Sequence, residues 1–195
     1  MRPLSVDDLD EEIRTAIEWD DETAIAALGA ELDHLEAQQR RETTCLQAAL
    51  WYAQQGLHVF ALQPGSKIPH PRSRGCKDAT TDPDLLRAWW TEHPGSNVAI
   101  ATGYLVDVID LDGPEANAWL LEVLDTLPPL SGKVSTPRAG GRHLYVKAVE
   151  GRGNRAGLAD RVDYRGLGGY VVAPPSTTDV GGYVWTRPLD MAGRS

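Results

Sequence analysis

The chain has 195 residues, of which 42% are hydrophobic and 24% are charged, as in a soluble globular protein of one domain with room for an appendage. No apolar run approaches the roughly 20 residues of a membrane-spanning helix, which excludes a membrane-spanning role. The N-terminus opens with acidic residues, unlike a secretory signal. Cys45 and Cys76 indicate neither a disulfide framework nor a zinc site. We therefore expect a cytoplasmic protein with no membrane partner.

The net charge of −9 is unevenly distributed along the chain. Residues 1–42 hold 13 acidic and 4 basic side chains, whereas residues 43–195 hold 15 of each. Within that balanced part, residues 133–165 carry eight basic and three acidic side chains. Such a local excess would attract a polyanion, although a solvated charged face explains it as well.

The acidic head, residues 1–42, has the apolar spacing of two amphipathic helices. Their apolar positions are Leu9, Ile13 and Ile17 in the first helix, and Ile25, Leu28, Leu32 and Leu35 in the second. We expect an N-terminal helical extension that packs on its own domain. A helical hairpin or a docking arm would also fit.

The next segment predicts a helix, a strand and a long loop. Thr43 is a candidate N-cap for a third helix, and Gly56 would end it. Residues 58–62 have the composition of a buried strand. The loop that follows, through Asp78, is dense in Pro, Gly and Ser.

A further helix is predicted after Asp82, which would cap it, with Pro83 in its first turn and Pro94 beyond its end. The helix carries the pair Trp89 and Trp90. Two adjacent indoles suggest base stacking, but their helical spacing beside two leucines favours packing in the core.

The remaining elements are mostly strands. They are expected at residues 97–102, 106–112, 133–136, 142–147, 170–173 and 183–186, with one helix at about 114–127. Many strands and few helices, in no regular alternation, predict an α+β domain with a mostly antiparallel sheet.

The segment 106–113, V-D-V-I-D-L-D-G, places two acids near the end of a strand. Because side chains alternate across a strand, Asp110 and Asp112 share one face, while Asp107, Ile109 and Leu111 point to the other. Two neighbouring carboxylates repel each other unless a cation or a shared proton relieves the repulsion, and a hard divalent ion is the usual partner. A strand-end acid that caps a turn is the simpler alternative.

A third acid, Asp163, lies in the candidate strand R-V-D-Y-R-G between two arginines. Three carboxylates would suffice for two metal ions, which can activate an attacking hydroxyl and stabilise a leaving pyrophosphate. Without that context, Asp163 would simply pair with Arg161 or Arg165.

Between these acids lies S-T-P-R-A-G-G-R-H-L-Y, residues 135–145. Its glycines allow the backbone to approach a ligand, and a hydroxyl, a guanidinium and an imidazole offer donors to phosphate oxygens. A triphosphate suits this chemistry. A plain hairpin connection is the competing interpretation.

In this order, V-I-D-L-D-G, S-T-P-R-A-G-G-R-H-L-Y-V and V-D-Y-R-G-L-G-G-Y-V-V-A-P-P-S resemble the primase-polymerase branch of the archaeo-eukaryotic primase superfamily, found in phage and plasmid replication proteins. Upstream, G-L-H-V-F-A-L-Q-P-G-S-K-I-P and G-C-K-D-A-T-T-D-P extend the resemblance. It covers about residues 45–186, and implies an RRM-like catalytic core within a domain of residues 43–190.

The resemblance also implies the site residues. Asp110, Asp112 and Asp163 would be catalytic ligands of two Mg²⁺ or Mn²⁺ ions. The nucleotide-binding residues would be His143, Thr136, Arg138, Arg165 and Lys67.

The implied reaction is template-directed nucleotidyl transfer by a DNA primase, a DNA polymerase or both. The implied partners are a single-stranded DNA template, nucleoside triphosphates and a helicase. The sequence has no Gly-x4-Gly-Lys-Ser/Thr loop, the ATP-binding motif of such a helicase. The helicase would therefore lie in the same longer chain or be a separate protein. Two alternatives stay open, a non-catalytic DNA-binding module at a replication origin and a metal-dependent nuclease. The acid triad disfavours the first, because carboxylates repel phosphate, and the Gly-Gly turn disfavours the second.

Overall fold

A computed structural model describes residues 22–191 of the chain, which divides into two compact units, residues 1–43 and 44–195. Helix α2 (Glu22–Gln54) is continuous, so the prediction that a helix begins at Thr43 was wrong. Thr43 follows Arg40, Arg41 and Glu42, all of them good helix formers, and this local propensity overrides the capping signal. The helix predicted around Leu9, Ile13 and Ile17 lies outside the described residues.

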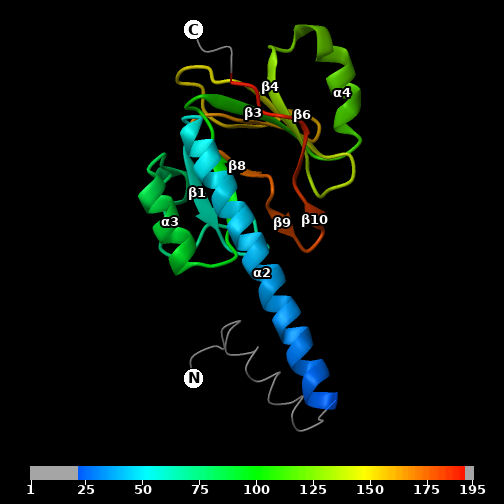
Figure 1. The fold of residues 1–195 in the computed structure, drawn as a ribbon. Coiled ribbons are helices and arrows are strands. Elements are labelled where there is room, and N and C mark those ends of the chain that lie inside the picture. The colour runs from blue at the N-terminus through cyan, green and yellow to red at the C-terminus, as the bar shows by residue number, and fades with distance from the viewer. Residues whose placement is uncertain (1–21, 192–195) are drawn as a thin grey trace. The chain divides into compact units, whose positions relative to one another are not determined.

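The second unit contains two main antiparallel sheets (Figure 1). The smaller has the order β1-β2-β8, made of β1 (Val59–Leu62), β2 (Asn97–Ala101) and β8 (Tyr170–Ala173). The larger has the order β11-β4-β5-β3-β7-β6, made of β11 (Val184–Arg187), β4 (Leu130–Ser135), β5 (Arg142–Lys147), β3 (Val106–Leu111), β7 (Val162–Arg165) and β6 (Arg155–Ala159). The short strands β9 (Thr177–Thr178) and β10 (Gly181–Gly182) pair with each other.

Few helices accompany these sheets. They are α3 (Pro83–Glu92), α4 (Ala116–Val123) and the 3-10 turns η1 (Gly75–Lys77) and η2 (Leu124–Thr126). The α+β class with mostly antiparallel strands is therefore confirmed. Within residues 22–191, no helix has both the length and the apolar composition that crossing a membrane requires.

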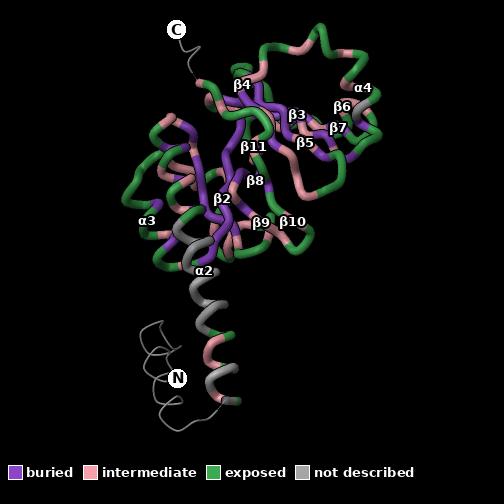
Figure 2. Tube along the Cα trace, turned by 45° about the vertical axis from the view of Figure 1, so that its right-hand side comes forward, coloured by how far each residue is buried: buried purple, intermediate pink, exposed green. Residues whose placement is uncertain are grey.

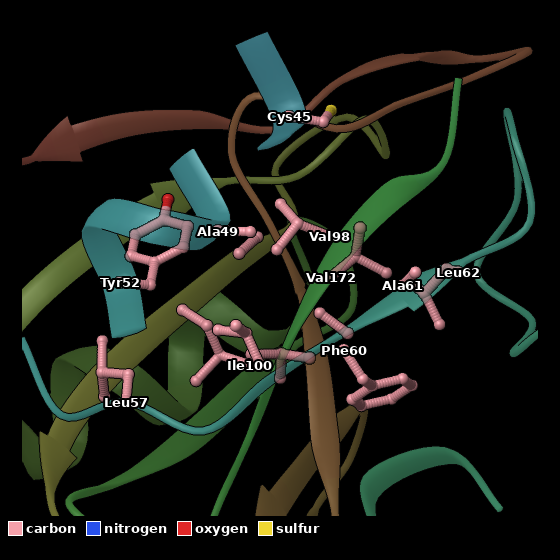
Figure 3. Packing of buried hydrophobic residues seen from close by; sticks show 14 of the residues in the cluster. Cys45, Ala49, Tyr52, Leu57, Phe60, Ala61, Leu62, Val98, Ile100 and Val172 are labelled. Atoms are coloured by element: carbon pink, nitrogen blue, oxygen red, sulfur yellow. The ribbon is translucent and has the colours of Figure 1, made fainter. Parts of the chain in front are cut away.

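The core consists of two hydrophobic clusters, and strand β3 contributes to both. Val106 and Val108 belong to the larger cluster, together with α2 and the smaller sheet, whereas Ile109 and Leu111 belong to the other, which includes Ala116 of α4. Figure 2 shows buried residues following the strands of both sheets. Figure 3 shows side chains of α2 and of the smaller sheet within the larger cluster. The predicted alternation of β3 side chains between two faces is thus confirmed.

Helix α3 begins and packs as predicted. The Asp82 carboxylate caps it by accepting from the backbone N–H groups of residues 84 and 85. Trp90 is buried and donates its indole N–H to the Ser96 carbonyl at 3.1 Å, and Trp89 packs against the same core cluster. Core packing was therefore the right interpretation of the pair.

Candidate active site

The candidate site is built on the central strand of the larger sheet. Strand β3 lies between β5 and β7, and the register pairs Asp110 with His143 on one side and with Asp163 on the other. Three residues predicted from separate motifs therefore form one row across three strands. Asp112 follows β3 directly, and its backbone N–H donates to the Arg161 carbonyl at 2.9 Å.

A pocket of about 350 Å³ opens at this end of β3. Six of the eight predicted site residues line it, namely Lys67, Asp110, Asp112, Thr136, Arg138 and Arg165. Residues 170–172 of β8 line it as well, so both sheets contribute to its walls. His143 and Asp163 are not part of this lining, although both are register partners of Asp110.

Arg165 joins the two acids that pair across β3 and β7. Its Nη2 atom donates to Oδ2 of Asp110 at 3.2 Å and to Oδ2 of Asp163 at 2.9 Å. Burial raises the pKa of the Asp110 carboxyl, and the Arg165 guanidinium partly opposes that rise. Asp163 also accepts from the Gly157 backbone N–H at 2.8 Å. Two adjacent carboxylates thus share one cation.

Asp112 lies in a more open part of the pocket, with its side chain about half exposed. Its Oδ1 atom is 3.5 Å from Nη1 of Arg138, whose side chain is exposed to a similar extent. An ion pair between two solvent-exposed side chains is weak, because water screens it. Asp112 therefore keeps oxygen atoms available to a ligand.

The glycine-containing turn connects β4 to β5, so the hairpin interpretation describes its backbone correctly. The Thr136 N–H donates to the Gly141 carbonyl at 3.1 Å, and the Gly141 N–H donates to the Arg138 carbonyl at 2.9 Å. A Cβ atom on Gly141 would lie 2.3 Å from Oγ1 of Thr136 and 3.1 Å from the Arg138 carbonyl oxygen, so a larger residue there would force the Thr136 side chain to shift. The same turn holds Thr136 and Arg138 at the pocket wall.

His143 is buried beside Asp110. Its Nε2 atom lies 3.6 Å from Oδ1 of Asp110, and its ring packs against Tyr183 with 5.7 Å between centroids. Burial lowers the pKa of His143 to about 3, helped by the positive charges of Lys67 and Arg165. At neutral pH the imidazole is therefore uncharged. Among the described residues, its Nδ1 atom has no hydrogen-bond partner.

Lys67 belongs to the loop between β1 and α3, which two hydrogen bonds fasten near the pocket. The Tyr170 hydroxyl donates to the Lys67 carbonyl at 3.1 Å, and the Asn97 side-chain amide donates to the Ser66 carbonyl at 2.9 Å. These bonds fix the backbone of the loop and leave the Lys67 ammonium exposed. Its positive charge acts on both Asp110 and His143.

Among the other lining residues, two with polar side chains were not predicted as site residues from the sequence, Asn154 and Tyr170. Asn154 accepts from the Gly166 N–H at 3.0 Å, and a Cβ atom on Gly169 would lie 2.2 Å from its Oδ1. Tyr170 was visible only as part of an apolar strand. The dense glycines of G-L-G-G-Y were the available signal, because they allow this close approach.

The carboxylates fit a hard divalent ion in chemistry, but their side chains are not gathered around one point. Within residues 22–191, no group of three or more His, Cys, Asp or Glu side chains is arranged to hold a metal ion. Asp110 and Asp163 instead share a cation of the chain itself, Arg165. Because Nη2 of Arg165 contacts both carboxylates, a single cation can reach the two of them.

Fold and site together define an α+β domain in which carboxylates and basic side chains line one pocket. Residues 49–194 match the family described as "Bifunctional DNA primase/polymerase, N-terminal". The match spans most of the chain, so the protein belongs to this family. No curated protein matched the sequence. Membership implies nucleotidyl transfer in DNA replication, with DNA and nucleotides as substrates, and the family generally uses divalent metals.

Proposed function

We propose that residues 43–190 form a catalytic domain for template-directed nucleotidyl transfer, acting as a DNA primase, a DNA polymerase or both in phage or plasmid replication. Single-stranded DNA and nucleoside triphosphates are its proposed substrates. A helicase, in the same longer chain or separate, is its proposed partner. Residues 1–42 are proposed to be an accessory extension.

One observation carries this proposal: Asp110 lines the pocket and is the register partner of Asp163, and Lys67, Arg138 and Arg165 line the same pocket. A site for phosphate alone would be weakened by carboxylates, because they repel it. A site for a metal alone has no use for three cations. A metal-bound triphosphate requires both kinds of residue.

The donor set agrees with divalent ions in its chemistry. Carboxylate oxygens are ligands that Mg²⁺ and Mn²⁺ prefer, and Asp110, Asp112 and Asp163 would hold the two ions. When bound, these ions would supply activation of a 3′-hydroxyl and charge stabilisation of the leaving pyrophosphate. Arg165 would then have to leave the carboxylates that it now bridges.

The remaining residues would bind and orient the triphosphate. Lys67, Arg138 and Arg165 would contact phosphate oxygens, and the Thr136 hydroxyl would donate to one of them. The uncharged His143 would direct Nε2 at Asp110 and keep that carboxylate in position. A direct contact of His143 with the triphosphate stays a prediction.

A template-extension assay tests the proposal. The full chain is incubated with Mg²⁺ or Mn²⁺, a primed or unprimed single strand, and deoxy- or ribonucleoside triphosphates. Asp110→Asn and Asp112→Asn should each lower incorporation by about a hundredfold or more, because each removes a charge that the transition state needs. Asp160→Asn is the matched control, since Asp160 is an exposed acid outside the pocket, and it should retain full activity.

Three outcomes would count against the proposal. Equal incorporation by the wild type and both active-site variants would remove the assigned acids from the reaction. Degradation of the strand in place of extension would indicate the nuclease alternative. DNA binding without incorporation under any of these conditions would indicate a binding module.

A further inference from the structure

A second pocket of about 400 Å³ lies outside the candidate active site and shares no lining residue with it. Its lining comes from β1, from the loop between β1 and α3, from α3, and from the residue that directly follows α3. The lining residues include Phe60, His70, Arg72, Trp89, Glu92 and His93. None of these residues has a part in the proposed reaction.

Flat rings dominate this pocket. The imidazoles of His70 and His93 are stacked, with 4.1 Å between centroids and 10° between planes. Ser96 fixes this pair, because its Oγ atom lies 2.8 Å from Nε2 of His70 and donates to the His93 carbonyl at 2.6 Å. Trp89 adds an indole at the same pocket. Such rings offer π-faces on which a nucleobase of any sequence can stack.

The charges favour a base over a phosphate inside the pocket. Two acids line it, Asp78 and Glu92, beside one cation, Arg72. Burial and the neighbouring imidazole lower the pKa of His70, so this ring is uncharged at neutral pH. A phosphate would find little net positive charge there, whereas a stacked base needs none.

The loop around the pocket is basic and suits a nucleic-acid backbone. Residues 63–78 contain Lys67, Arg72, Arg74 and Lys77 and a single acid, Asp78. All four basic residues are exposed. Exposed cations along a strand path neutralise phosphates without regard to sequence.

The same loop connects the two pockets. Lys67 lines the candidate active site, and His70, three residues on, lines the second pocket. Phe60 of the second pocket packs edge-on against Tyr170 of the active site, with 5.2 Å between centroids. The register of the smaller sheet pairs Phe60 with Ala99 and Ala99 with Val172, so Phe60 and Tyr170 share one sheet face. A single strand on this face could reach both pockets.

We propose that the His70–His93 pocket is a stacking site for an unpaired base of single-stranded DNA whose backbone follows the basic loop 63–78. That the strand is the template rests on the proposed function. Binding of the base itself does not, because stacking requires neither metal nor nucleotide.

The test is fluorescence anisotropy with a labelled single-stranded oligonucleotide in EDTA and without nucleotides. His70→Ala and His93→Ala should each weaken binding about tenfold, which is about 1.4 kcal/mol and within the range for one stacked base. Neither variant should lose affinity for an abasic oligonucleotide of the same length. His93→Phe should bind as the wild type does, because it keeps a ring. Thermal melting checks that each variant is folded.

Matched controls separate stacking from other effects. His58→Ala removes an imidazole that stacks on Tyr104 at 4.2 Å but lies outside the pocket, and it should leave affinity unchanged. Arg72→Ala should weaken binding to intact and abasic strands alike and should lower the salt dependence.

Wild-type affinity in both histidine variants would overturn the proposal, and so would an equal loss on the abasic strand. The binding of free dATP is measured as well. If the histidine variants lost affinity for dATP but not for the oligonucleotide, the assignment of the pocket to a DNA strand would be overturned. Asp160→Asn, which changes an exposed acid outside both pockets, should bind the oligonucleotide normally. If the protein binds in this way but incorporates nothing, the proposed function fails and the stacking site stands.

Discussion

Replacing Arg165 by methionine removes the guanidinium that contacts both Asp110 and Asp163. Removing one partner of a fully buried ion pair costs about 3–5 kcal/mol. Here solvent reduces the cost, because the side chains of Arg165 and Asp163 are 35% and 29% exposed, whereas that of Asp110 is 16% exposed. We expect a loss of about 1–2 kcal/mol in the free energy of unfolding of the metal-free protein.

Thermal melting in EDTA measures this loss. A chain of this length shifts its melting temperature by about 2–4 °C per kcal/mol, so a drop of several degrees is expected. Arg155→Met is the control, since Arg155 is an exposed base on β6 outside the pocket, and it should shift melting little. Added Mn²⁺ should raise the melting temperature of Arg165→Met more than that of the wild type, because the ion no longer competes with the guanidinium.

The effect of pH has a defined sign. Burial already raises the pKa of Asp110 above 3.8, and loss of Arg165 would raise it further. As pH rises, the Asp110 carboxyl therefore ionises in the unfolded state before it ionises in the folded state. The free energy of unfolding thus falls as pH rises from 3.8 to the higher pKa of the folded state. The deficit of Arg165→Met should therefore be largest at neutral pH and shrink towards pH 3.8. Coincident melting of wild type and variant in EDTA at neutral pH would refute the reasoning.

Two more predictions concern the β4–β5 hairpin. The pKa of His143 is lowered from 6.5 to about 3 in the folded protein. As pH falls below 6.5, the unfolded state therefore takes up a proton at this residue before the folded state does. The free energy of unfolding then falls by up to ~1.4 kcal/mol per pH unit because of His143. Urea denaturation at pH 7 and pH 5 should show a smaller acid loss for His143→Gln, and an equal loss would contradict this. Gly141→Ala should cost about 1–3 kcal/mol, because its Cβ atom would lie 2.3 Å from Oγ1 of Thr136. Unchanged melting would contradict that contact.

Local patterns predicted the parts of the fold that local physics decides. Alternation along residues 106–112 correctly separated Asp110 from Ile109 and Leu111, because side-chain direction follows from strand geometry alone. The Asp82 cap and the following proline correctly placed the start of α3. The strands at 142–147 and 170–173 coincide with β5 and β8, whose apolar residues are buried.

Long-range pairing could not be predicted in this way. The sequence around Asp163 does not indicate that β7 pairs with β3, because the order of strands in the sheet depends on how the whole domain packs. Strand β6 was missed, since Arg155–Ala159 is an edge strand with little burial and a central glycine. The placement of Asn154 and Tyr170 at the pocket follows from the same long-range arrangement.

The core and the candidate site impose one constraint on strand β3. Val106 and Val108 pack into the larger hydrophobic cluster, and Ile109 and Leu111 pack into the smaller one. Both faces of the strand therefore contact apolar residues. A slip of one residue against β5 or β7 would place these side chains on the wrong faces and move Asp110 out of line with His143 and Asp163. Packing on both faces therefore fixes the register that brings the acids together. Because that register is fixed by core residues, the carboxylates can repel each other without displacing the strand that carries them.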